Sequence, residues 1–183
     1  MGLEEFNLAI LPKLIYNADT WFEIDDKSIN RLEKLQTILL RCLFSVPNST
    51  PATALNWDCG FLSMEYRVYH KKLMFLHHLL ILDESSLSSE IFDIQKEFNL
   101  PGFVQEARKL LIMFSLPNII DDKAKISKIQ WKKMVNKVIV SNYESKLKQN
   151  INGYSKLKNG PMASECFGQK PYITEMSMKP CPG

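Results

Sequence analysis

Apolar residues recur at helical spacing along most of the chain up to Asn150. The most regular stretch lies within residues 50–82, where six large apolar side chains follow one another at alternating steps of four and three: Leu62, Tyr66, Tyr69, Leu73, Leu76 and Leu80. This spacing places all six on one stripe of a helix. Residues 73–82 contain no acidic residue, lysine or arginine, so we expect this half of the helix to be buried on several sides. The pattern predicts the central core helix of the fold.

Caps and chain breakers predict further helices on both sides of this stretch. Residues 3–22 predict a first helix, kinked at Pro12 because proline lacks an amide. A second helix should begin near Asp25 and end before Pro47, with Leu32, Leu35 and Leu39 on its apolar side. Short helices are expected over residues 51–59, 86–98 and 101–116, and Gly60 should stop the first of these.

A long basic helix should follow, beginning at Asp121 or Ser127 and reaching about Lys148. Ser127 and Gln130 have the spacing of a capping box. Beyond Asn150, Gly and Pro interrupt the chain every few residues, and no β-type alternation is sustained anywhere. The sequence therefore predicts an all-α fold, an irregular multi-helix bundle with a basic C-terminal helix and a loosely structured tail.

The charge distribution supports the same division into a helical bundle, a basic helix and a tail. The composition, 45% hydrophobic and 23% charged over 183 residues, is typical of a globular protein. Residues 1–122 carry 11 Lys and Arg against 17 Asp and Glu, a net charge of −6, whereas residues 123–158 carry 10 Lys against one Glu, a net charge of +9. We expect an acidic helical bundle over 1–122, a basic helix over 123–150 and a loose tail over 151–183.

The basic helix carries the candidate binding residues. Lys125, Lys128 and Lys132 share one face by steps of three and four, and Lys133 and Lys137 continue beside them. A lysine ladder contacts phosphates without reading sequence, and Trp131 and Tyr143 on the same helix would offer stacking surfaces for bases. The same pattern also fits a solvated helix face whose apolar side is formed by Ile126, Ile129, Met134 and Val138.

The sequence contains no pattern that is typical of a catalytic site or a metal site. The four cysteines, Cys42, Cys59, Cys166 and Cys181, lack metal-ligand spacing, and adjacent histidines point about 100° apart on a helix. No Ser, Cys or Thr has a recognisable base nearby, and no glycine-rich phosphate loop occurs. We therefore expect no cofactor, no metal and no enzyme activity.

The N-terminus lacks the basic start and apolar run of a secretory signal, which favours an intracellular location, cytoplasmic or nuclear. The uncharged run over residues 73–82 is also too short to cross a bilayer, which requires about 20 residues. We therefore expect no membrane partner.

Four stretches in order share their pattern with one protein family: ILPKLIYNADTW (10–21), RLEKLQTILLRCLFSVPNSTPATAL (31–55), NWDCGFLSMEYRVYHKKLMFLHHLL (56–80) and NGYSKLKNGPMASECFGQKPYITEMSM (152–178). Together they resemble the region that follows the polymerase domain in LINE-like, non-LTR retrotransposon reverse transcriptases. The first departs from the family, with Asn17 where Gly is usual and Asp19 where Glu is usual. Because Asn tolerates left-handed backbone geometry, we expect the bend at this point to survive.

The resemblance implies a remnant of the thumb and following helices. The family's catalytic aspartates lie upstream of this region, and its terminal Cys/His cluster is not matched; the lone Asp19 cannot supply a carboxylate pair for two Mg²⁺ ions. We expect a non-catalytic fragment that at most contacts an RNA or DNA backbone without sequence preference. The alternatives are a host-recruited helical module that binds a protein partner through exposed apolar helix faces, and a decayed element with no selected function.

Overall fold

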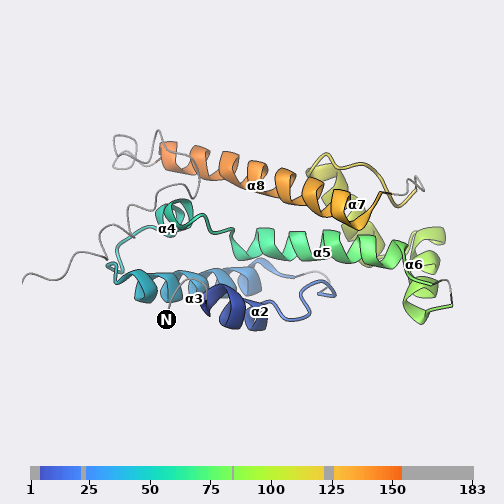
Figure 1. Ribbon diagram of the computed structural model, residues 1–183, viewed down its shortest axis with the longest axis horizontal. Coiled ribbons are helices and arrows are strands. Elements are labelled where there is room, and N and C mark those ends of the chain that lie inside the picture. The colour runs from blue at the N-terminus through green and yellow to red at the C-terminus, as the bar shows by residue number, and fades with distance from the viewer. Residues whose placement is uncertain (1–4, 22–23, 84, 122–125, 154–183) are drawn as a thin grey trace, which may run out of the picture. The chain divides into compact units, whose positions relative to one another are not determined.

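The computed structural model describes residues 5–21, 24–83, 85–121 and 126–153. Within these ranges all regular structure is helical and no strand occurs, which confirms the all-α prediction. The elements, coloured from blue to orange in Figure 1, are the π-helix η1 (Phe6–Ile10) and the α-helices α2 (Leu11–Leu14), α3 (Asp26–Phe44), α4 (Ala52–Cys59), α5 (Met64–Leu80), α6 (Leu87–Glu97), α7 (Phe103–Met113) and α8 (Lys128–Gly153). Apart from its first three residues, the predicted tail lies outside the described ranges.

Side-chain caps start the helices α3, α6 and α8 near the residues that the sequence predicted. The Asp25 carboxylate accepts a hydrogen bond from the Ser28 amide at 3.0 Å, and the Ser86 hydroxyl accepts one from the Ser89 amide at 3.1 Å. At α8 the predicted capping box is confirmed, because Ser127 and Gln130 each accept the other's backbone N–H at 3.3 Å. Each cap satisfies amides that have no partner inside the helix.

Four helices end in the same way. The first residue after α3 and α4, and the second after α6 and α7, adopts the left-handed conformation, and the next amide reaches back to a carbonyl in the last turn, as in a Schellman motif. Gly60 does this after α4, as the sequence predicted, with φ of 65°. At the ends of α3, α6 and α7 the position is taken by Ser45, Asn99 and Ser115, which the sequence did not mark as stops.

The first helix is shorter than predicted. Regular helix ends at Leu14, and Asn17 adopts the expected left-handed conformation with φ of 57°. The Thr20 hydroxyl then closes the turn by donating to the Asn17 carbonyl at 3.0 Å. Pro12 lies in the first turn of α2, which follows the π-helix η1 directly, so its missing amide falls where the π-helix changes to an α-helix. Asp19 consequently lies in the turns beyond α2 and not within a helix.

The described residues form two compact units, which are described separately: the first lies within Met1–Tyr16, Asp25–Glu65 and Ser141–Gly183, and the second within Asn17–Ile24 and Tyr66–Val140. Helices α5 and α8 contribute residues to both. Within the described residues, no helix is both long and apolar enough to span a bilayer. The predicted division at 122/123 and 150/151 rests on charge and chain breaks and stays a prediction.

The first unit is built around a buried polar residue of α3. Gln36 is buried, with its Nε2 donating to the Asn56 side chain at 3.3 Å and to the Leu62 carbonyl at 3.2 Å. Leu40 and Phe44, four and eight positions on, are buried with it, whereas Leu35 is 45% exposed. The predicted inward face of this helix is therefore wrong, because α4 and the loop after it provide the acceptors that Gln36 requires.

The second unit is organised around α5, as predicted. Leu73 and Leu76 are fully buried, and Tyr66 and Tyr69 pack edge-on against Phe114 beyond α7 with ring centroids 6.0 and 5.9 Å apart. Lys72 of α5 is buried and forms an ion pair with Glu106 of α7. Helix α6 runs across the C-terminal end of α5 (Figure 1).

Candidate nucleic-acid interface

Packing fixes the orientation of α8. Every fourth residue along it is buried: Trp131, Val135, Ile139, Tyr143 and Leu147. A step of four advances by slightly more than one turn, so these side chains form one row that winds slowly around the helix. Ile129, expected on the apolar side, is 69% exposed, so that part of the prediction is wrong.

The two aromatic residues of α8 are not available for base stacking. Trp131 is fully buried, its Nε1 donates to the Leu73 carbonyl at 2.9 Å, and its ring stacks on His77 with centroids 6.1 Å apart. Tyr143 is buried too, and its hydroxyl accepts a hydrogen bond from the Asn56 amide at 3.1 Å. The prediction of stacking surfaces is therefore wrong, because the core of each unit takes these large rings.

The predicted lysines of α8 are exposed, and they fall into two rows. Lys128 and Lys132 lie on one flank of the buried row, and Lys133 and Lys137 lie on the opposite side of the helix, because each residue turns the helix by about 100°. Among the described residues, no carboxylate lies within ion-pair distance of these four lysines. Lys125, the fifth predicted residue, lies outside the described residues.

The flank that bears Lys128 and Lys132 continues in Asn136, another step of four along the helix. The Asn136 Oδ1 accepts a hydrogen bond from His70 Nε2 of α5 at 2.7 Å, which leaves the –NH₂ of this exposed side chain available as a donor. Burial lowers the pKa of His70, and the charges of Lys132 and Arg67 lower it further. The hydrogen bond to Asn136 opposes these effects and raises the pKa. Nε2 carries its proton both in the imidazolium and in the Nε2–H tautomer, so either form can donate to Asn136. Sequence reasoning missed both residues, since their pairing joins segments far apart in the chain.

Two lysines nearer the C-terminal end of α8 are engaged within the first unit. Lys146 Nζ forms an ion pair with the Glu65 carboxylate at 3.0 Å. Lys148 Nζ lies 5.7 Å from the centre of the Trp57 ring, within the range of a cation–π contact. These contacts distinguish the two lysines from the four exposed ones, which have no acidic partner among the described residues.

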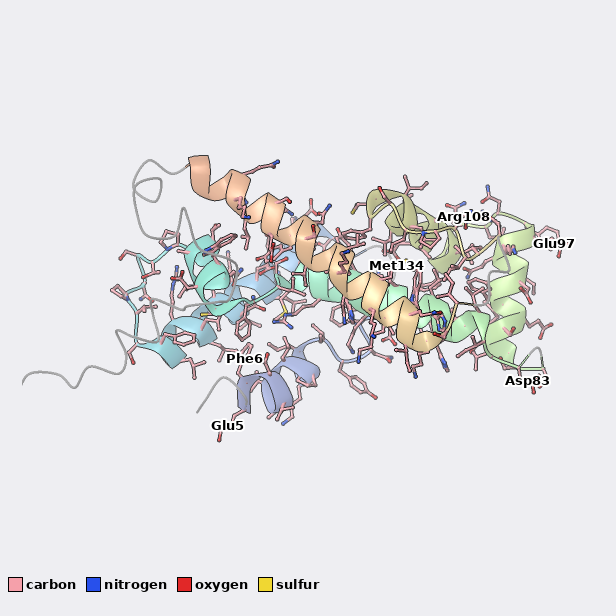
Figure 2. All side chains as sticks on the ribbon, turned by 45° about the horizontal axis from the view of Figure 1, so that its top comes forward. Glu5, Phe6, Asp83, Glu97, Arg108 and Met134 are labelled. Atoms are coloured by element: carbon pink, nitrogen blue, oxygen red, sulfur yellow. The ribbon has the colours of Figure 1, made fainter. Side chains whose placement is uncertain are left out.

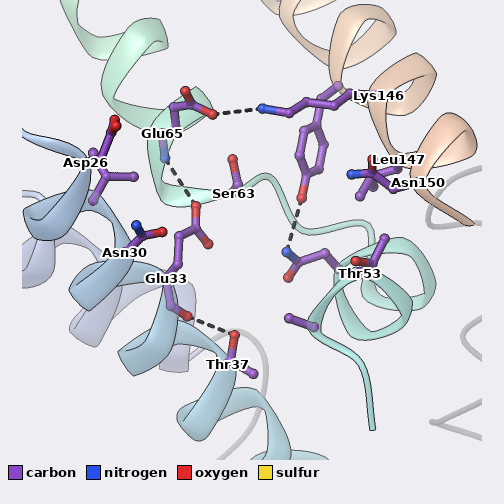
Figure 3. A pocket seen from close by; sticks show the side chains of 14 residues that line it. Asp26, Asn30, Glu33, Thr37, Thr53, Ser63, Glu65, Lys146, Leu147 and Asn150 are labelled. Atoms are coloured by element: carbon purple, nitrogen blue, oxygen red, sulfur yellow. Dashed lines mark hydrogen bonds and ion pairs between the residues drawn. The ribbon is translucent and has the colours of Figure 1, made fainter. Parts of the chain in front are cut away.

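The first unit also contains a polar cleft of about 520 Å³ between α3, α4 and α8 (Figure 3). Glu33 points into it and accepts a hydrogen bond from the Glu65 backbone amide at 3.3 Å, so it caps the start of α5. Burial raises the pKa of Glu33. The cleft joins three separate segments of the chain, which explains why no local sequence pattern marked it.

Both carboxylates of the cleft have partners within the protein. Glu33 is held by the amide it caps and Glu65 is held by Lys146, so neither carboxylate is presented to a substrate with a partner acid or base. No group of three or more metal-ligating side chains occurs among the described residues. Burial raises the pKa of the Cys59 thiol to about 12, which leaves it protonated and unreactive at neutral pH.

No family model, curated protein or solved structure matches this chain. The candidate interface is therefore judged on geometry and charge.

Proposed function

We propose that the chain is a non-catalytic helical module whose α8 contacts the phosphate backbone of RNA or DNA. One observation carries the proposal: Lys128, Lys132 and Asn136 form a ladder of exposed donors, and no described carboxylate pairs with its lysines. Steps of four residues space the donors by about 6 Å along a helix that packing holds in place. The resemblance to the region after a retrotransposon polymerase domain supports the same role.

The chemistry of the ladder defines the ligand. Lysine ammonium groups recognise phosphate charge and do not distinguish bases, and the Asn136 amide adds one neutral donor. Because the aromatic side chains of α8 are buried, binding gains nothing from base stacking. Affinity should therefore depend steeply on salt and weakly on sequence.

The first test measures the affinity of the full chain for a short single-stranded RNA by fluorescence anisotropy across a salt series. Changing Lys128 and Lys132 to Gln should flatten the log–log slope by about 1.4, because each lost phosphate contact to a single strand removes about 0.7. The matched control changes Lys27 and Lys34 of α3, both exposed, and should leave the slope as it was. No binding at low salt, or equal flattening in the control, would overturn the proposal.

A second measurement locates the contact. A phosphate beside Lys132 offsets the positive charge that lowers the pKa of His70, so bound RNA should raise that pKa. Titration of the His70 ring signals by NMR, with and without RNA, detects this change. A His70 pKa that RNA leaves unaltered would exclude binding at this ladder.

A further inference from the structure

Helix α6 carries an exposed apolar stripe that the nucleic-acid proposal does not use. Its inward side buries Phe92 and Ser89, yet four large apolar side chains on another side remain exposed by 70, 47, 42 and 65%: Leu87, Ile91, Ile94 and Phe98. Their steps of four, three and four place them in one line, with the spacing of a helix that pairs with another helix. Figure 2 shows side chains projecting outward along α6 between the labelled Asp83 and Glu97.

An apolar pocket opens beside this stripe, within the second unit. Its volume is about 200 Å³, and its lining includes Phe75, Leu79, Phe92, Phe103 and Ile91 of the stripe. An apolar cavity of about 150 Å³ holds a benzene molecule, whereas sites for separate small ligands measure about 300 to 1,000 Å³. The pocket therefore has the size for one aromatic or branched side chain of a partner that lies along α6.

The charges around the stripe identify the kind of partner. Helix α6 contains Glu90, Asp93 and Glu97 against Lys96, a net charge of −2. No basic side chain in the described part of the chain lies within ion-pair distance of the three acids. Lys96 is directed elsewhere, because its Nζ donates to the Ile120 carbonyl at 2.6 Å.

The same charges disfavour a second copy of α6 as the occupant. In an antiparallel pair, Glu90 and Glu97, which border the stripe, would face the same residues of the other copy. Glu97 also lies in the last turn of α6, where a negative charge opposes the helix dipole and a cation from outside would be favoured. Basic flanks on the partner satisfy both conditions.

We propose that the outer face of α6 docks an amphipathic helix of another protein, with an apolar stripe bordered by Lys or Arg. The partner's stripe packs along Leu87, Ile91, Ile94 and Phe98, one large side chain enters the pocket, and its basic residues pair with Glu90 and Glu97. The apolar contact supplies the affinity, and the charges set the orientation and the choice of partner.

The probe is a synthetic helical peptide with leucines at helical spacing on one face and lysines on the other. The full chain should bind it in fluorescence anisotropy, whereas a scrambled peptide of the same composition and a Leu/Glu peptide of the same pattern should not bind. Changing Ile94 and Phe98 to Gln should weaken binding by about tenfold or more. Both positions are exposed, so circular dichroism should show an intact fold.

Two further variants complete the test. Ile112→Gln removes an apolar side chain that is 79% exposed on α7, away from the stripe, and should leave peptide affinity unchanged. Glu90→Gln with Glu97→Gln should weaken binding several-fold and reduce its salt dependence. Equal binding of the scrambled peptide, an equal loss in Ile112→Gln, or self-association of the chain that Ile94→Gln with Phe98→Gln abolishes would overturn the proposal. The last outcome would assign the face to a second copy.

Discussion

The ion pair between α5 and α7 should respond unequally to removal of its two partners. Lys72 Nζ lies 2.5 Å from Glu106 Oε1, and the side chains are 2% and 25% exposed, respectively. Removing Glu106 leaves a buried ammonium without its counter-charge, which costs about 3–5 kcal/mol. Removing Lys72 leaves a carboxylate on a side chain that is 25% exposed and can turn toward water, so we expect a smaller cost of about 1–3 kcal/mol.

Replacing both partners should restore stability. An apolar pair of similar size avoids the desolvation of two charges, and such replacements are close to neutral or even stabilising. It also removes the Glu106 Oε2 atom, which is buried without a hydrogen-bond partner. The variants Lys72→Met, Glu106→Met and their combination keep good helix formers at both positions. The double variant should lie within about 1 kcal/mol of the parent, far from the sum of the single effects.

Urea unfolding followed by both tryptophan fluorescence and circular dichroism measures these free energies. The two signals must coincide for a two-state treatment, because the chain has two compact units. Lys109→Met, at an exposed position of α7, is the control and should change the free energy of unfolding by no more than about 0.5 kcal/mol. A larger loss for Lys72→Met than for Glu106→Met, or additive losses in the double variant, would refute this description of the pair.

Two other changes separate packing from binding and test the cleft. Trp131→Phe removes the donor to the Leu73 carbonyl and should lower the free energy of unfolding by about 1–3 kcal/mol. RNA affinity should not change. A loss of RNA affinity in the folded variant would mean that the ring contacts bases. The pKa of Glu33 in the folded chain is raised above its ordinary 4.5. The stability that protonated Glu33 contributes is therefore fully present below pH 4.5 and is lost as the pH rises through the folded pKa. Relative to the parent, Glu33→Gln should therefore gain stability between acid and neutral pH in urea unfolding, and a difference that does not vary with pH would contradict this.

Helix starts and the all-α class could be predicted from the sequence, because they depend on interactions between residues that are close together in the chain. A capping pair such as Ser127 and Gln130 forms between residues three positions apart, and Gly60 needs only its own conformational freedom to end α4. The helix ends at Ser45 and Ser115 could not be predicted in this way. Serine has no intrinsic preference for the left-handed conformation, so the surrounding packing must impose it.

Which side of each helix faces inward was harder to predict, because several helices have more than one apolar side. In α3, Gln36 is buried in preference to Leu35 since Asn56 and the Leu62 carbonyl lie where they can bind its amide. In α6 both sides are apolar, and only the position of α5 shows that Phe92 packs inward. A hydrophobic period therefore identifies the helix, but the neighbouring elements decide which apolar side becomes core and which becomes a surface for binding.

Helix α8 shows how this choice determines the candidate function. Lysines occur at many angles around α8, and the position of the buried row that begins with Trp131 determines which of them face solvent. The same row removes both aromatic rings from the surface, which changes the expected ligand contact from stacking plus charge to charge alone. His70, which no sequence pattern marked as part of a binding surface, holds the Asn136 amide beside Lys132. The proposed binding ladder depends on core packing, so a variant that rotates α8 in its packing should lose salt-dependent RNA binding even with every lysine retained.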